Sequence, residues 1–150
     1  MNTLACIPAF NEEGVIGNLI KETLSFVDSV VVCDDGSFDN TLKEAEKSGA
    51  IVIKHNKNKG KGAALKTLFN YARDSQADII ITIDGDGQFL PNEITKLIKP
   101  IQEKSADIVV GYRFDDNTEM PSYRKFGNKI LDRATNIITN LPIRDTQSGF

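Results

Sequence analysis

The sequence predicts an α/β fold in which a mainly parallel central sheet is flanked by helices. Short runs rich in Ile and Val, typical of strands buried on both faces, recur along the 150 residues. Segments with the periodicity of amphipathic helices, about 3.6 residues, lie between these runs. Clusters of Asp, Asn and Gly follow several runs, where a strand would turn toward a helix. This alternation is typical of consecutive βαβ units.

Five runs are predicted as strands. They cover residues 3–8, 29–34, 50–54, 78–84 and 106–111. The fourth run and its flanks, Ala77 to Ile83, read Ala-Asp-Ile-Ile-Ile-Thr-Ile. Such a continuously apolar run favours a parallel strand that is covered on both faces.

Amphipathic helices are predicted between and after these strands. Asp39 or Asn40 is suited to cap a short helix over residues 42–47, which Gly49 would end. A further helix is predicted over about residues 123–140. Two more helices show apolar residues at intervals of three and four, namely Leu65, Leu68, Phe69 and Ala72 in one and Ile94, Leu97, Ile98 and Ile101 in the other.

Length and composition favour one globular domain over residues 1–150. The chain is 40% hydrophobic and 26% charged, and its net charge of −3 disfavours nucleic acid as a partner. No apolar run approaches the ~18 residues of a membrane span, and the first strand begins without a signal-peptide pattern. We therefore expect a cytoplasmic location. Cys6 and Cys33 lie in apolar runs and are predicted to be buried, reduced thiols.

The segment Asp84-Gly85-Asp86-Gly87-Gln88 carries the most chemical information. It places two carboxylates and an amide oxygen at alternate positions, directly after a predicted strand. Oxygens in this arrangement can converge on Mg²⁺ or Mn²⁺, which would take its remaining ligands from water and a diphosphate. A plain polar turn is the alternative interpretation. A metal together with a diphosphate indicates nucleotide-sugar chemistry.

Three predicted strands end in polar clusters that should meet at one edge of a parallel sheet. They are residues 8–13, 34–37 and 84–88. Helix capping alone could recruit such residues, but paired acids are less expected from capping. The basic segment 54–62 lies at the start of a predicted helix, and the alternative interpretation of its lysines is a solvated loop. We expect His55, the only histidine, to lie at the surface.

Six motifs occur in order along the chain: IPAFNEE at 7–13, VCDDGS at 32–37, NKGKG at 58–62, DGDGQ at 84–88, GYR at 111–113 and DTQSGF at 145–150. Together they resemble the inverting nucleotide-sugar glycosyltransferases of family 2, which have the Rossmann-like GT-A fold. The resemblance is strongest to the polyprenyl-phosphate branch, which includes dolichol-phosphate mannose synthases. It implies a UDP- or GDP-sugar donor, a divalent cation and a polyprenyl phosphate acceptor.

The resemblance also implies roles for individual residues on the donor side. Pro8, Phe10 and Glu12 would line the nucleoside pocket, and Asp35 would accept a hydrogen bond from a base N–H. Asp34 would be a structural partner at the strand end. Asp84, Asp86 and Gln88 would form the metal site, with Asp86 as the principal, catalytic ligand. Gly85 would let the backbone approach the donor, so a larger residue there should crowd it.

Residues later in the chain would complete the site. Arg113 and Arg124 are candidates for gripping the donor phosphates, with surface salt bridges as the alternative. Asp145 stands where many inverting family 2 enzymes place the carboxylate that deprotonates an acceptor hydroxyl. An acceptor phosphate is already an anion, so with such an acceptor Asp145 would instead orient the acceptor or the sugar.

We therefore expect a metal-dependent inverting transferase that moves a hexose from a UDP- or GDP-sugar to dolichyl or undecaprenyl phosphate. The chain ends at Phe150 within a motif, so we expect a truncated domain that transfers sugar poorly, from a protein attached to the cytoplasmic face of a membrane. The alternatives are a family 2 enzyme with a saccharide hydroxyl acceptor, a sugar-nucleotide pyrophosphorylase, and a module that binds nucleotide without turnover or serves as a receiver domain.

Overall fold

The computed structural model describes residues 1–88 and 90–111 of the chain. Strands and helices alternate as the sequence predicts. The strands are β1 (Thr3–Ala9), β2 (Ser29–Asp34), β3 (Ile51–Lys54) and β4 (Ile79–Thr82), and the helices are α1 (Ile16–Thr23), α2 (Thr41–Lys47), α3 (Lys61–Asp74) and α4 (Ile94–Gln102), which is preceded by the 3₁₀ turn η1 (Pro91–Glu93).

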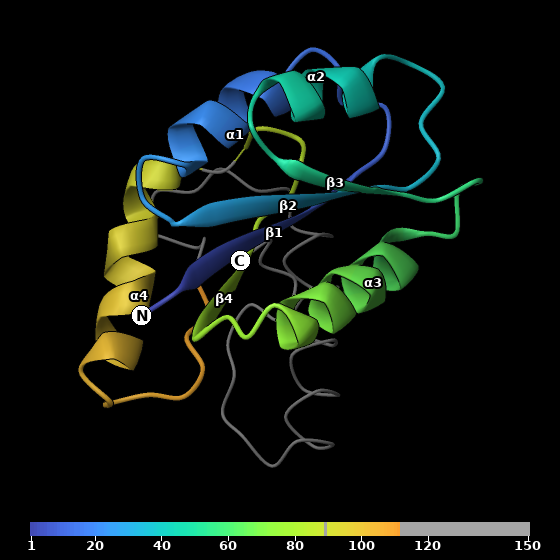
Figure 1. Cartoon of the computed structure of the whole chain (residues 1–150). Coiled ribbons are helices and arrows are strands. Elements are labelled where there is room, and N and C mark those ends of the chain that lie inside the picture. Colours follow the sequence, from blue (N-terminus) through green and yellow to red (C-terminus); the bar gives the residue numbers. More distant parts are fainter. Residues whose placement is uncertain (89, 112–150) are drawn as a thin grey trace, which may run out of the picture. The chain divides into compact units, whose positions relative to one another are not determined.

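The four strands form one parallel sheet in the order β3-β2-β1-β4 (Figure 1). β1 is hydrogen-bonded to β2 on one side and to β4 on the other, with Cys6 opposite both Val31 and Thr82. Because all four strands run the same way, their carboxyl ends lie at one edge of the sheet. This confirms the expectation that the polar clusters after β1, β2 and β4 share an edge.

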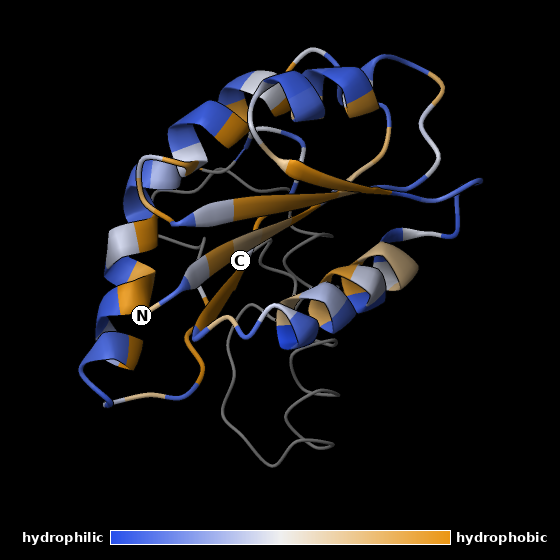
Figure 2. Cartoon of the chain, in the orientation of Figure 1, coloured by the Kyte–Doolittle hydropathy of each residue, from blue (hydrophilic) through white to orange (hydrophobic). Residues whose placement is uncertain are grey.

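The two faces of the sheet are covered by different helices: α1 and α2 lie on one face and α3 on the other (Figure 1). Side chains at alternate positions of β1 and β2 pack against α3, and together they form a cluster of Leu4, Cys6, Val31, Cys33, Ala64, Leu68 and Ala72. The intervening strand residues, such as Ile7 and Val32, are fully buried on the opposite face. The hydrophobic colour of both central strands in Figure 2 reflects this double burial.

Two predictions about the sheet are wrong in detail. Residues 106–111 form no strand, and Ile108 is 79% exposed, because an apolar composition does not by itself supply a hydrogen-bonding neighbour. β4 is not covered on both faces: Ile79 and Ile81 are buried, but Ile80 is 40% exposed. The helix predicted over residues 123–140 lies outside the described residues.

The chain divides after Ile98. Residues 1–98 form one compact unit that contains the whole sheet, and Lys99 begins a second. The expectation of a single domain over residues 1–150 stays a prediction. Within the described residues, no helix has the length and apolar character needed to cross a bilayer.

Candidate functional site

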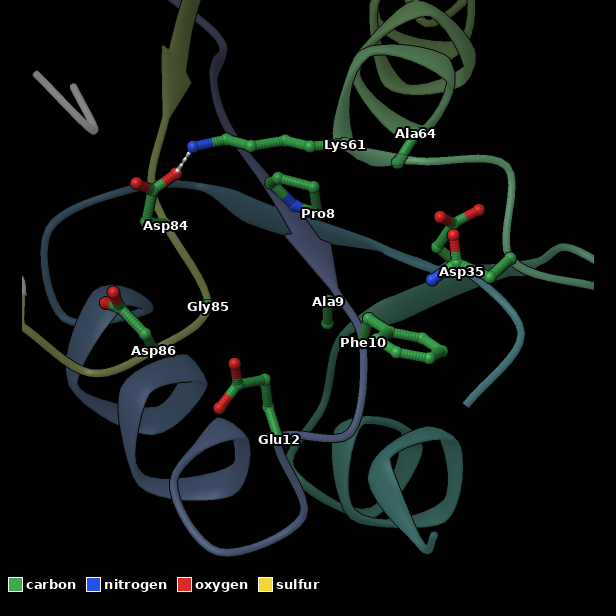
Figure 3. Close-up of a pocket in the computed structure, with 11 residues that line it drawn as sticks. Pro8, Ala9, Phe10, Glu12, Asp35, Lys61, Ala64, Asp84, Gly85 and Asp86 are labelled. Carbon is green, nitrogen blue, oxygen red and sulfur yellow. Dashed lines mark ion pairs between the residues drawn. The ribbon is translucent and has the colours of Figure 1, made fainter. Parts of the chain in front are cut away.

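Three strand ends and the start of α3 surround one pocket of about 330 Å³ (Figure 3). This volume is in the range of small-molecule binding sites, about 300–1,000 Å³. The first residues of α3 close one side, so the amino end of this helix faces the pocket. The lining residues are Pro8, Ala9, Phe10, Glu12, Asp35, Asn58, Lys61, Ala64, Asp84, Gly85 and Asp86.

The pocket gathers the predicted residues of three separate motifs. Seven of them line it: Pro8, Phe10, Glu12, Asp35, Asp84, Gly85 and Asp86. Gln88 does not; its side chain is exposed, while its backbone N–H donates to Asp86 Oδ1 at 3.0 Å. Arg113, Arg124 and Asp145 lie outside the described residues.

The loops after β1 and β2 hold each other in place by reciprocal hydrogen bonds. Asn11 N–H donates to Ser37 Oγ at 2.9 Å, and Phe38 N–H donates to Asn11 Oδ1 at 2.9 Å. Glu12 N–H donates to Thr41 Oγ1 at 2.7 Å, at the start of α2. These bonds fix the backbone that carries Phe10 and Glu12 into the pocket, and the ring of Phe10 meets that of Phe38 edge to face, with centroids 6.1 Å apart.

Helix α2 begins after Asn40, one of its two predicted caps, but the Asn40 side chain makes no capping hydrogen bond in the described structure. Asp39 Oδ1 accepts the N–H of Thr41 at 3.0 Å, and Oδ2 accepts the N–H of Glu13 at 3.2 Å. Glu13 in turn accepts the N–H of Asn40 at 2.8 Å. The Asp39 carboxylate therefore bonds the start of α2 and the loop after β1 at once.

Gly85 is required by a close approach to the end of β1. A Cβ at this position would lie 2.9 Å from the backbone oxygen of Pro8 and 3.6 Å from the Cα of Ala9. The prediction was that a larger residue at Gly85 would crowd the donor. In the structure such a residue would first displace the strand end that forms the pocket floor.

The β4 end of the pocket concentrates negative charge. Asp84 Oδ1 lies 2.5 Å from Lys61 Nζ at the start of α3, and Asp86 is exposed (Figure 3). Burial and the nearby carboxylates of Asp86 and Asp39 raise the pKa of Glu12 above its usual value. A mobile cation at this end would relieve the repulsion between these acids.

Asp35 stands at the opposite end and is 2% exposed. Its carboxylate accepts N–H bonds from the backbone of Lys59 (3.0 and 3.1 Å) and Gly60 (2.7 Å), and its Oδ1 lies 2.6 Å from His55 Nδ1. Burial alone would raise the pKa of Asp35, but the hydrogen bonds from His55, Lys59 and Gly60 hold it below the ordinary value. Asp35 is therefore an ionised acceptor in a fixed position.

Its neighbour Asp34 projects to the other face of the sheet and is also buried. Oδ1 accepts the N–H of Ser37 at 2.9 Å, which closes the turn after β2, and Oδ2 has no hydrogen-bond partner within residues 1–88 and 90–111. This geometry agrees with the structural role predicted for Asp34.

The expectation that His55 lies at the surface is wrong. The side chain is buried at 7% exposure, and its Nε2 lies 2.9 Å from Thr67 Oγ1 and 3.6 Å from Cys33 Sγ. The reason is strand parity: Ile53, two residues earlier, packs on the cluster under α3, so His55 projects to the same face.

Cys6 and Cys33 are buried and free, as predicted. Burial raises the pKa of Cys6 to about 12, and burial with the charges of Asp35 and Asp34 raises that of Cys33 to about 11. Both are therefore thiols at neutral pH.

The described residues contain no group of three or more His, Cys, Asp and Glu side chains that could hold a metal ion by themselves. The predicted acids Asp84 and Asp86 are a pair at the pocket wall. Such a pair is typical of Mg²⁺ sites, in which one or two carboxylates act together with substrate phosphates and water.

Sequence and structure comparisons identify the family. Residues 4–150 match the family described as Glycosyl transferase family 2. The chain belongs to this family. The parallel sheet with its flanking helices, and the likeness to solved family structures, confirm the predicted GT-A fold.

Two curated relatives are similar to this family 2 chain. One is the UDP-N-acetylglucosamine–dolichyl-phosphate N-acetylglucosaminyltransferase of Methanococcus voltae, 37% identical over 96% of the chain. The other is the undecaprenyl-phosphate 4-deoxy-4-formamido-L-arabinose transferase of Shewanella sediminis, 31% identical over 89% of the chain. The chain spans 66% and 44% of the lengths of these relatives.

Among solved structures, the chain is similar to glucosyl-3-phosphoglycerate synthase from Mycobacterium tuberculosis, in complex with Mn²⁺ and UDP-glucose. The TM-score is 0.56 and the identity is 29%, over 67% of this chain and 39% of that protein.

Proposed function

We propose that this protein is an inverting glycosyltransferase that moves a hexose from a UDP- or GDP-sugar to a polyprenyl phosphate, with the help of Mg²⁺ or Mn²⁺. The observation that carries the proposal is the convergence of Glu12, Asp35, Asp84 and Asp86, from three strand ends, on one pocket of about 330 Å³. The names of the two curated relatives, both transferases acting with a polyprenyl-type phosphate, support the acceptor class.

The pocket has two chemically different ends, which suit the two ends of a nucleotide sugar. Asp35 and Phe10 would face the nucleoside, because a buried acceptor and an aromatic ring match a base with N–H donors and a flat face. Lys61, at the first turn of α3, would face the diphosphate, where its ammonium and the helix amides oppose the negative charge. The solved relative that holds UDP-glucose supports this donor class.

The residues at the β4 end fit a divalent cation. Asp84 and Asp86 offer the hard oxygen ligands that Mg²⁺ and Mn²⁺ prefer, and Gln88 is the third predicted ligand. Lys61 already holds a positive charge against Asp84 at 2.5 Å, which indicates that this end attracts cations. A bound cation would stabilise the charge that develops on the departing nucleoside diphosphate.

The reaction that we propose is a single in-line displacement. An oxygen of the acceptor phosphate attacks the anomeric carbon, and the bond from that carbon to the diphosphate breaks, with its electron pair leaving on the nucleoside diphosphate. The anomeric centre is thereby inverted. The chain would contribute by positioning the donor and opposing its charge. Because the attacking phosphate is an anion, Asp145 would orient the acceptor rather than remove a proton.

We further propose that the protein acts at the cytoplasmic face of a membrane, where a polyprenyl phosphate presents its head group. Arg113 and Arg124, which lie outside the described residues, would bind phosphate groups. This placement is a consequence of the proposed acceptor.

The test has two steps. Calorimetric titration of the protein with UDP, GDP and their sugars, with and without Mn²⁺, should show metal-enhanced binding of one nucleotide family. The intact protein with the sugar donor so chosen should then glycosylate dolichyl or undecaprenyl phosphate. Absence of nucleotide binding would contradict the donor site.

Other products would identify the alternatives. Release of pyrophosphate from a sugar phosphate and a nucleoside triphosphate would indicate a pyrophosphorylase. Transfer to a saccharide hydroxyl but not to a lipid phosphate would indicate the other acceptor class, with Asp145 as the base. Binding without any turnover would indicate a binding module.

A further inference from the structure

His55 is the centre of a buried network that joins β2, β3 and α3. Its Nδ1 lies 2.6 Å from Asp35 Oδ1, and its Nε2 lies 2.9 Å from Thr67 Oγ1 and 3.6 Å from Cys33 Sγ. An ionised carboxylate can only accept hydrogen bonds, so Nδ1 carries a hydrogen and donates a hydrogen bond to Asp35. His55 itself does not line the pocket.

The sheet register brings these groups together. Asp34 of β2 lies opposite Lys54 of β3, so the next residues, Asp35 and His55, lie side by side. Residues two positions earlier, Cys33 and Ile53, pack toward α3. Asp35 and His55 therefore project to the same face, where Thr67 of α3 meets the ring.

The carboxylate of Asp35 also holds the loop between β3 and α3. The backbone N–H groups of Lys59 and Gly60 both donate to it, and the latter bond is 2.7 Å long. Asn58, in the same loop, lines the pocket, as does Lys61 directly after it. The orientation of the Asp35 carboxylate thus determines where its acceptor oxygens lie and how the loop between β3 and α3 is held at this end of the pocket.

A close backbone contact supports the same loop independently. Gly36 has a positive φ of 76°, and a Cβ there would lie 2.6 Å from the carbonyl carbon of Lys57. The loop is therefore pressed against the turn after β2 while its amides bind Asp35. Little room is left for an alternative loop position.

We propose that His55 is a positioning residue for the nucleoside end of the donor pocket. It fixes one oxygen of Asp35 through the Nδ1–H bond, so that the carboxylate and the amides of Lys59 and Gly60 are set before a nucleotide arrives. The proposal rests on the proposed function, because it assumes that this pocket takes a nucleoside diphosphate. His55 acts through Asp35 and touches no substrate.

Two amide substitutions separate this role from a space-filling one. In His55→Asn the side-chain nitrogen takes the place of Nδ1 and still donates to Asp35. In His55→Gln the nitrogen takes the place of Nε2 and leaves Asp35 Oδ1 without that donor. Lys54→Ala, at the exposed neighbouring residue, is the matched control for changes at the end of β3.

The readouts are the dissociation constants of UDP and GDP for the intact protein, measured by calorimetry, and the NMR signals of the Lys59 and Gly60 amides. We expect His55→Gln to weaken nucleotide binding roughly tenfold, as for the loss of one buried charged hydrogen bond. The NMR signals of the Lys59 and Gly60 amides should shift in this variant. His55→Asn should bind within about twofold of the unaltered protein, with little change in either amide.

The outcomes distinguish the two proposals. Equal nucleotide affinity in the unaltered protein and in His55→Gln, or equal losses in the Asn and Gln variants, would overturn the positioning role and leave the proposed function standing. Failure of the unaltered protein to bind either nucleotide would overturn the proposed function and this inference with it. A lower melting temperature in both variants without a difference in affinity would show that His55 only fills space.

Discussion

The carboxylates at the two ends of the pocket are bonded to very different extents. At the β2 end, Asp35 is 2% exposed and accepts hydrogen bonds from the backbone of Lys59 and Gly60 and from His55. At the β4 end, Asp86 is exposed and accepts one backbone N–H, from Gln88, and Asp84 has an exposed lysine as its partner. One end is set by the fold, and the other keeps its oxygens accessible.

The difference fits the two parts of a nucleotide sugar. A base is recognised by rigid, directional hydrogen bonds, which a buried acceptor held in one orientation supplies. A diphosphate with its cation needs charge and free ligand positions, which exposed carboxylates supply. If this comparison is right, substitutions at the β2 end should change stability and loop order, whereas substitutions of Asp84 or Asp86 at the β4 end should change ion binding without affecting the fold.

The largest effect is expected from Gly36→Ala. The added Cβ would lie 2.6 Å from the backbone of Lys57, at a residue with a φ of 76°. Overpacking and backbone strain together should lower the free energy of unfolding by about 3 kcal/mol. Urea denaturation measures the change. Gly62→Ala is the control, since nothing lies within 4 Å of its Cβ position, and it should be neutral or stabilising. Equal stability of the two variants would contradict the account of the loop.

Asp86→Asn should abolish the metal-enhanced part of donor binding and leave the fold intact. The side chain is exposed and, in the described part of the chain, bonds only the N–H of Gln88, so the melting temperature should hardly change. Calorimetry with nucleotide in the presence and absence of Mn²⁺ measures the effect, which we expect to exceed roughly tenfold. Asp74→Asn, at an exposed acid of α3, serves as the control. An unchanged response to Mn²⁺ would remove Asp86 from the metal site.

Lys61→Ala should raise the affinity of the nucleotide-free protein for Mn²⁺ by a few-fold. The ammonium lies 2.5 Å from Asp84 Oδ1 and competes with a cation for that oxygen. Lys61 is 59% exposed and Asp84 is 30% exposed, so the loss of this partly solvated pair should change stability by less than about 1 kcal/mol. Calorimetric titration with Mn²⁺ alone measures whether the affinity rises or falls. Lys66→Ala, on the same helix, is the control. Weaker Mn²⁺ binding in Lys61→Ala would contradict competition between the two cations.

The smallest effect is expected from Glu12→Gln, which should change how stability depends on pH. Burial and the charges of Asp86 and Asp39 raise the pKa of Glu12 in the folded state above 4.5, its ordinary value. Ionisation therefore costs more in the folded than in the unfolded protein, and stability falls as the pH rises through the raised pKa. The variant should be more stable than the unaltered protein at pH 7, by at most about 0.5 kcal/mol, and should show no gain in stability below about pH 4. Thermal melts across this range measure the difference; a gain at low pH would have the wrong sign.

Sequence reasoning predicted most of the sheet, because its signals are local. The Ile and Val runs predicted β1, β2 and β3 to within one residue at each end, and of the two predicted caps of α2, Asp39 and Asn40, it is Asn40 that occupies the N-cap position. The same signal failed at residues 106–111. A strand exists only when a neighbour pairs with it, and composition does not report pairing.

The site was predictable in outline and not in its contacts. Motifs after β1, β2 and β4 indicated which residues would meet, since parallel strands end at one edge. The Lys61–Asp84 pair and the buried position of His55 were missed. The alternation from Ile53 to His55 would have placed the histidine under α3, but its position in a basic segment favoured a solvated interpretation.

The adjacent acids at the end of β2 have a consequence for how this chain can vary. Asp34 and Asp35 project to opposite faces of the sheet, one toward the turn at Ser37 and the other toward His55. A single-residue insertion or deletion within β2 would exchange the two faces and leave both carboxylates without their donors. Length changes in homologous chains should therefore fall in the loops around this strand and spare the strand itself.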